Sequence, residues 1–221
     1  NTIEENSILV VTSKIVAISE GSVIDLDKAN KDELVKKQAD KYLPKEGNTY
    51  NLFVTIKDNI LAVNAGVDES NSDGQYVLWP KNPQESANTI REHLVKSRNL
   101  KNVGVLITDS KTTPLRYGIT GIGIAHSGFR AINDFVGTQD IFGRVLKMTK
   151  VSIIDGLSAA SAVVMGEGAE QTPLAIITDI PFVKFQDHNP TDDELKLLKI
   201  DPETDVYGEF LQSSDWKKGN K

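Results

Sequence analysis

The chain has 221 residues, of which 39% are hydrophobic and 25% charged, as is usual for a soluble globular protein with one large domain or two small ones. A net charge of −6 disfavours non-specific nucleic-acid binding, which needs Lys and Arg to displace counterions from phosphates. Nucleotide binding stays open, because a metal ion can supply the positive charge. The absence of cysteine excludes thiol catalysis, disulfides and zinc–thiolate sites. No apolar run is long enough to span a membrane, so we expect a cytoplasmic protein with no membrane or nucleic-acid partner.

The N-terminal third is predicted to begin with a buried strand at residues 7–12, followed by a short helix at 13–20 that ends at Gly21. Residues 28–42 have helical composition and stop before Pro44. Residues 51–56 and 60–64 are apolar runs that flank a polar turn, which predicts a hairpin.

The middle of the chain is predicted to hold one helix and two strands. Asn82 can cap a helix, Pro83 suits its first position and Glu85 completes the capping pattern, so a helix should run to about residue 97. Residues 103–108 are a predicted strand. Residues 118–125 are apolar and glycine-rich, which favours a strand with close backbone contacts.

The remaining pattern predicts a strand at 144–152, a helix at 153–165, a strand at 173–178 and a helix at 191–198 capped by Thr191. Strands and helices mix without strict alternation, so we expect an α+β fold with mixed or antiparallel sheets and packed helices. One domain should cover residues 1–185, followed by a polar C-terminal extension over 186–221.

Two acidic segments follow apolar runs. Residues 64–71 read Asn-Ala-Gly-Val-Asp-Glu-Ser-Asn after one predicted strand, and Thr108-Asp109-Ser110 closes another. Two carboxylates at strand exits, Asp68 and Asp109, could form a hard-cation site for Mg²⁺ or Mn²⁺, which are commonly shared with nucleotide phosphates. The alternative is that both are ordinary turn residues.

Phosphate-binding motifs of the common kinds are absent. There is no Walker motif, and the Gly121-Ile122-Gly123 run is followed by His126 where a dinucleotide fingerprint needs glycine, so these glycines should serve packing. Lys14, at the end of the first strand, could act as a point charge beside a phosphate or be a solvated lysine at a helix start.

Six motifs stand in the order of one family, and together they resemble the coenzyme F-420-0:gamma-glutamyl ligases. They lie at residues 9–16 with Glu20-Gly21, 64–71, 107–110, 134–137, 140–144 and 164–167. The resemblance includes sequences described as folate-metabolism gamma-glutamate ligases. It implies a gamma-glutamyl ligase-like fold and a homodimer. It leaves open whether 134–137 and 140–144 contact substrate or pack between subunits.

The resemblance implies an enzyme that uses GTP and two divalent ions, with K⁺ as a further candidate. The enzyme would attach L-glutamate to a carboxylate acceptor, coenzyme F-420-0 or a folate-like compound, through an acyl phosphate. Asp68, Asp109, Ser110 and Glu167 would hold the metal, with Asp68, Asp109 and Arg116 in catalytic roles. The nucleotide would be bound by Thr12, Ser13, Lys14, Asn71, Met165, Gly166, Glu167, Gly168, Ala169, Glu170, Gln171 and Thr172.

Three departures from the family pattern keep other functions open. Ile18 stands where the family usually has a second lysine, and Gly121 stands where it often has an acidic residue. We also expect that an N-terminal segment that helps hold the nucleotide in the family is missing from this sequence. The rival functions are a non-catalytic nucleotide- or metal-binding homologue and a two-metal phosphohydrolase. Arg116 is read equally well as a phosphate clamp and as a plain surface residue.

Overall fold

The computed structural model describes residues 2–220, and these fold into two compact units. Unit 1 comprises residues 2–12, 82–110 and 120–198. Unit 2 comprises residues 13–81, 111–119 and 199–220. The units therefore interleave along the sequence, and the division falls between Thr12 and Ser13 and between Ser110 and Lys111, next to candidate site residues.

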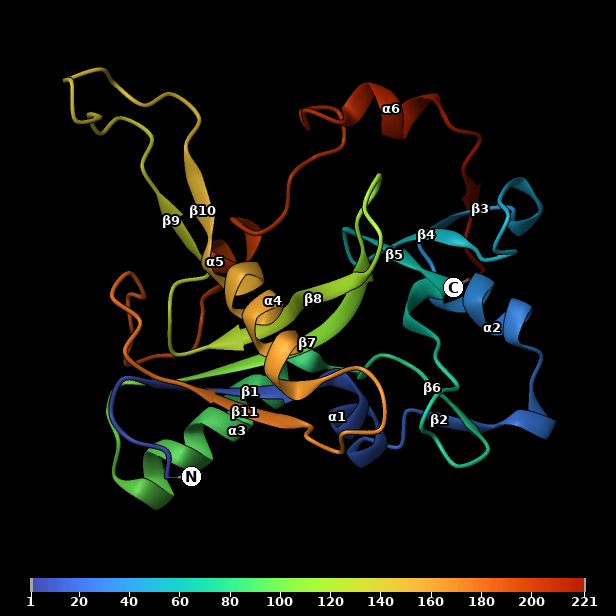
Figure 1. The fold of residues 1–221 in the computed structure, drawn as a ribbon, viewed down its shortest axis with the longest axis horizontal. Coiled ribbons are helices and arrows are strands. Elements are labelled where there is room, and N and C mark those ends of the chain that lie inside the picture. Colours follow the sequence, from blue (N-terminus) through green and yellow to red (C-terminus); the bar gives the residue numbers. More distant parts are fainter. Residues whose placement is uncertain (1, 221) are drawn as a thin grey trace. The chain divides into compact units, whose positions relative to one another are not determined.

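Unit 1 is a sheet with helices (Figure 1). Its elements, two of whose strands continue into unit 2, are β1 (Ser7–Thr12), α3 (Pro83–Arg98), β7 (Val103–Thr112), β8 (Ile119–Ser127), β9 (Ile132–Asp134), β10 (Lys150–Ser152), α4 (Ile153–Met165), β11 (Leu174–Ile177) and α5 (Asp192–Lys196). The main sheet has the order β11-β1-β7-β8, with β1 parallel to β7 and antiparallel to β11. The first six residues of β7 are all buried, as expected for a strand covered on both faces.

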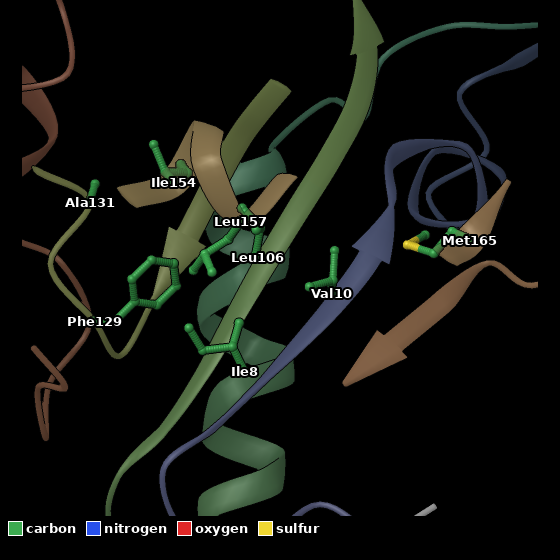
Figure 2. Close-up of a cluster of buried hydrophobic side chains, with 8 residues drawn as sticks. All are labelled: Ile8, Val10, Leu106, Phe129, Ala131, Ile154, Leu157 and Met165. Atoms are coloured by element: carbon green, nitrogen blue, oxygen red, sulfur yellow. The ribbon is translucent and has the colours of Figure 1, made fainter. Parts of the chain in front are cut away.

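The core of unit 1 lies between this sheet and α4 (Figure 2). Ile8 and Val10 alternate along β1, and Leu106 stands beside Val10 on the neighbouring strand. Ile154 and Leu157 of α4 pack on the same cluster. Apolar side chains that alternate along the strands thus pack against apolar side chains at helical spacing on α4, which is the pattern the sequence predicts.

Glycines in β8 allow α4 to approach closely. A Cβ built on Gly121 would lie 2.1 Å from the backbone oxygen of Ser158, and one on Gly123 would lie 2.2 Å from the Ile154 side chain. Both distances are too short for real atoms. The prediction that these glycines serve packing is therefore confirmed.

Unit 2 contains two small antiparallel sheets and three short α-helices within its described residues. Its elements are α1 (Ser13–Ser19), β2 (Val23–Asp25), α2 (Lys31–Gln38), β3 (Lys41–Leu43), β4 (Val54–Lys57), β5 (Ile60–Val63), β6 (Gln75–Val77), α6 (Gly208–Ser213) and β12 (Lys217–Lys218). One sheet has the order β12-β3-β4-β5 and the other pairs β2 with β6. Leu34, Val35, Phe53, Val67 and Tyr76 are central to its core.

The α+β prediction is confirmed, and most predicted elements are found with shifted ends. Residues 41 and 42, predicted as the end of a helix, belong to β3 because they pair with β4. The strand predicted at 144–152 is limited to β10. The segment 182–189 is held to unit 1, where buried Arg91 donates to the backbone oxygen of Gln186 at 3.1 Å. Among the described residues, no helix combines the length and apolarity that crossing a membrane requires.

Candidate active site

The loop that carries Asp68 is held in an unusual backbone conformation within unit 2. Asn64, Ala65 and Gly66 have φ values of 52°, 50° and 71°, a left-handed run that costs free energy at the two non-glycine positions. Buried Thr55 compensates, because its Oγ1 accepts from the Ala65 amide at 2.9 Å and donates to the Ala62 oxygen at 2.8 Å. The side chain of Asn64 also accepts from the Phe53 amide at 3.0 Å. The β4–β5 hairpin thus fixes the turn before Asp68.

Gly66 is required for a second reason. A Cβ at this position would lie 2.1 Å from the Trp79 indole nitrogen. The indole, 6% exposed, therefore packs directly on the backbone of the turn. Trp79, which follows β6, therefore supports the loop that carries Asp68.

Asp68 itself is fixed at backbone and side chain. Its backbone amide donates to the backbone oxygen of Val77 at 3.0 Å, and its backbone oxygen accepts from the amide of Val77 at 2.7 Å. One carboxylate oxygen accepts from the amides of Glu69 and Ser70 at 2.7 and 2.9 Å. The other accepts from the Lys14 ammonium and the Ser70 hydroxyl, each at 2.7 Å.

These bonds keep Asp68 ionised. Burial by itself would raise the pKa of this carboxyl, but the hydrogen bonds from Lys14 and Ser70 outweigh burial, and the pKa is lowered. The Lys14 ammonium also donates to the Ser70 oxygen at 2.6 Å. A cationic group therefore already lies against Asp68, so any metal ion bound there would compete with Lys14.

Unit 1 brings a second pair of predicted site residues together. The Ser110 hydroxyl, near the far end of β7, lies 2.9 and 2.7 Å from the two carboxylate oxygens of Glu167. Glu167 follows Gly166, which ends α4 with a φ of 76°. Hydroxyl and carboxylate oxygens are the ligand types that Mg²⁺ and Mn²⁺ prefer.

Met165 is the last residue of α4 and its side chain is buried in the core of unit 1, whereas residues 167–172 form an exposed loop closed by its own side chains. The Thr172 hydroxyl donates to the Met165 oxygen, and the Gly168 amide donates to the Glu170 carboxylate at 2.7 Å. The Glu170 side chain lies against Gly166, where a Cβ would be 2.5 Å from it. Gln171 has a φ of 56°.

The other predicted residues are divided between the units. Thr12 and Asp109 belong to unit 1, whereas Ser13, Asn71 and Arg116 belong to unit 2. Asp109 does not close a turn as the sequence suggests: β7 continues to Thr112, so Asp109 lies within the strand. Among residues 2–220, no group of three or more His, Cys, Asp and Glu side chains lies close enough to hold a metal ion.

Arg116 lies in the segment that joins β7 to β8, together with two fully exposed apolar side chains. Leu115 and Tyr117 flank it, with relative exposures of 104% and 101%. Arg116 is exposed as well, and its side chain makes no hydrogen bond or ion pair within the described part of the chain. Both readings of Arg116 therefore remain.

Sequence reasoning missed the Lys14–Asp68 ion pair and the supporting roles of Thr55 and Trp79. Lys14 and Asp68 are 54 residues apart, and no local pattern joins them. The run of Asn, Ala and Gly before Asp68 was the available signal, because Asn and Gly tolerate a left-handed backbone.

Comparison with known proteins decides the family. A model of the F420-0:Gamma-glutamyl ligase family matches residues 1–179, which include every candidate site residue from Thr12 to Thr172. The chain belongs to this ligase family. It is 39% identical over 198 residues to a coenzyme F420:L-glutamate ligase of Methanocaldococcus jannaschii, covering 81% of this chain and 79% of the relative.

Other relatives carry the same name. A coenzyme F420:L-glutamate ligase of Methanococcus maripaludis is 39% identical over 194 residues, covering 81% of this chain and 78% of the relative. One from Methanosarcina mazei is 30% identical over 195 residues, covering 81% and 76%. The F420-0:gamma-glutamyl ligase family thus accounts for most of the chain, and the protein is an enzyme of the ligase class.

Proposed function

We propose that the protein is a GTP- and divalent-metal-dependent gamma-glutamyl ligase. It attaches L-glutamate to a carboxylate acceptor through an acyl phosphate. The match to named L-glutamate ligases over about four-fifths of both chains carries the proposal. Because the relatives are named for coenzyme F420, an acceptor of that type is our first choice, and a folate-like acceptor is the second.

The chemistry has two steps. A carboxylate oxygen of the acceptor attacks the terminal phosphorus of GTP, the bond to GDP breaks and an acyl phosphate forms. The amine of L-glutamate then attacks the acyl carbon, inorganic phosphate leaves, and the amine loses a proton to solvent. Alignment of the reactants by the protein can lower such barriers by about 7–11 kcal/mol.

The side chains near the two acidic segments suit this reaction. Following the family resemblance, Asp68 of unit 2 and Asp109 of unit 1 are each proposed as metal ligands, and Ser110 with Glu167 is proposed to hold a second ion. The ions would neutralise charge on the terminal phosphates. Ser110 and Glu167 support the assignment because their oxygens already lie within 2.9 Å of each other. K⁺ is a further candidate ion.

Lys14 gives the proposal a specific feature. Its ammonium lies 2.7 Å from Asp68 in the protein alone. When a metal ion takes the place beside Asp68, the displaced ammonium would be available to a phosphate oxygen. Thr12, Ser13, Asn71 and the loop 165–172 are proposed to bind the remainder of GTP.

Turnover of GTP separates this function from its rivals. With Mn²⁺ present, a ligase forms GDP only when both L-glutamate and an acceptor are added, a phosphohydrolase needs neither, and a non-catalytic homologue forms none. We expect the ligase result with a coenzyme F-420-0-type acceptor. GDP formation without acceptor, or none with any acceptor, would overturn the proposal.

We also propose a homodimer. The family resemblance implies this assembly. The glycine-rich segment of β8 does not supply the proposed interface, because Gly121 and Gly123 pack against α4 of the same chain. The arm formed by residues 132–152 extends from the sheet of unit 1 (Figure 1), and its Ile141 and Phe142 are 92% and 82% exposed. A second copy of the chain is the proposed cover for these side chains.

A further inference from the structure

Unit 2 contains a pocket whose lining includes none of the predicted site residues, although it shares Trp79 with the support of the Asp68 loop. Its volume is about 440 Å³, within the range of about 300–1,000 Å³ typical of small-molecule sites. It is walled by the segment after α1, the end of α2, the β4–β5 turn and the segment after β6. Its polar lining residues are Ser22, Gln38, Lys57, Asp58, Trp79 and Lys81.

Lys57 is the buried charge of this pocket. The residue is only 6% exposed, whereas Asp58 and Lys81 are exposed. Its ammonium lies 2.9 Å from the Gln38 side-chain oxygen and 5.1 Å from the centroid of the Trp79 ring. Gln38 is the last residue of α2, where the helix dipole also favours a positive charge.

The wall behind Lys57 is rigid. Trp79 cannot retreat, because its indole already touches the backbone of Gly66. Ser22 and Leu78 are joined by a backbone hydrogen bond of 3.0 Å. An ammonium held by an amide oxygen and an aromatic face needs little reorganisation to receive a negatively charged ligand group.

We propose that this pocket binds a small molecule that carries one oxyanion, a carboxylate or a phosphate. The oxyanion binds at Lys57, and the apolar part of the molecule packs on Leu78 and Pro80. The lining carries two ammonium groups and one carboxylate, and the carboxylates of Glu20 and Asp40 accept from the amides of Lys81 and Asp58, so the surroundings disfavour a ligand with several negative charges. This site lies outside the ligase reaction proposed above.

The test measures binding in the absence of GTP, metal and acceptor, so its failure is independent of the ligase function. The chain has two tryptophans, and Trp216→Phe leaves Trp79 as the fluorescent reporter. Benzoate and inorganic phosphate are titrated separately, with calorimetry as the second readout. We expect saturable binding of at least one probe, and the responding probe tells carboxylate from phosphate recognition.

Matched lysine variants locate the site. Lys57→Met, which keeps most of the side-chain volume, should weaken binding about tenfold or more. Lys37→Met, on the exposed part of α2, is the control and should leave affinity unchanged. If Lys57→Met lacks native circular dichroism, Lys81→Met at the rim replaces it, with about threefold weakening expected. Absence of saturable binding by either probe, or wild-type affinity in the pocket variant, would overturn the proposal.

Discussion

His126 should make the protein sensitive to acid. It lies in β8, is 1% exposed, and its Nδ1 has no hydrogen-bond partner among the described residues. Its ring packs edge-on against Phe129, with centroids 5.3 Å apart. Burial lowers the pKa of His126 from 6.5 to about 4, although the negative charge of Glu194 opposes this shift.

The sign and size of the effect follow from proton linkage. Below pH 6.5 the unfolded chain binds a proton at this histidine, whereas the folded protein does not until the pH approaches 4. The neutral, buried His126 therefore contributes its full stability above pH 6.5. The unfolding free energy then falls as the pH drops from 6.5 towards 4, because only the unfolded chain takes up the proton. At about 1.36 kcal/mol per pH unit, this interval corresponds to about 3 kcal/mol of unfolding free energy.

Urea unfolding at pH values from 7 to 4 measures this term. His126→Leu removes the titrating group, so the stability of the variant relative to wild type should improve by about 3 kcal/mol between pH 7 and pH 4. His93→Leu, at an exposed position, should follow the wild-type pH dependence. An NMR titration that gives His126 a pKa of 6 or above would refute the reasoning.

Three further predictions concern the site and the assembly. Asp68→Asn should abolish metal-dependent GTP turnover with native circular dichroism, whereas Asp73→Asn in the same exposed loop should stay active; turnover in both would remove Asp68 from the metal site. Thr55→Val should lower the unfolding free energy by about 1–3 kcal/mol in urea, because the buried Ala65 amide loses its acceptor; an unchanged midpoint would show that the turn is held otherwise. Wild type should sediment at twice the 24.2 kDa monomer mass, and the double variant Ile141→Ser/Phe142→Ser at the monomer mass; a wild-type monomer would contradict the dimer.

The sequence predicted best the elements whose pattern is local. β1 and α4 were placed correctly because an apolar run and a helical repeat can each be recognised within a few residues. The end of β7 was misplaced since pairing with β8 extends the strand through polar residues, which propensity alone assigns to a loop. Burial of Arg91 was not predicted because its partners lie outside its own helix, Val103 in β7 and Gln186 95 residues further along the chain.

The same division applies to the candidate site. The types and spacing of residues in 64–71 and 107–110 indicated an acidic site, and the Ser110–Glu167 contact was predicted only through the family resemblance. The Lys14–Asp68 pair depends on tertiary packing in unit 2, which no sequence window contains. Supports such as Thr55 are also invisible in sequence, because a buried threonine in a strand is ordinary until its hydrogen bonds are known.

The position of β1 in its sheet has a consequence for folding during synthesis. One edge of β1 pairs with β11, so the backbone of Ile8 to Val11 on this edge stays unpaired until residues 174–177 have been synthesised. Until then, the backbone groups on that edge of β1 stay unpaired even after β7 has covered the other edge, which favours slow folding and mispairing with other chains. Recovery from the unfolded state should therefore depend strongly on protein concentration, and a chaperone that shields the first strand should improve it.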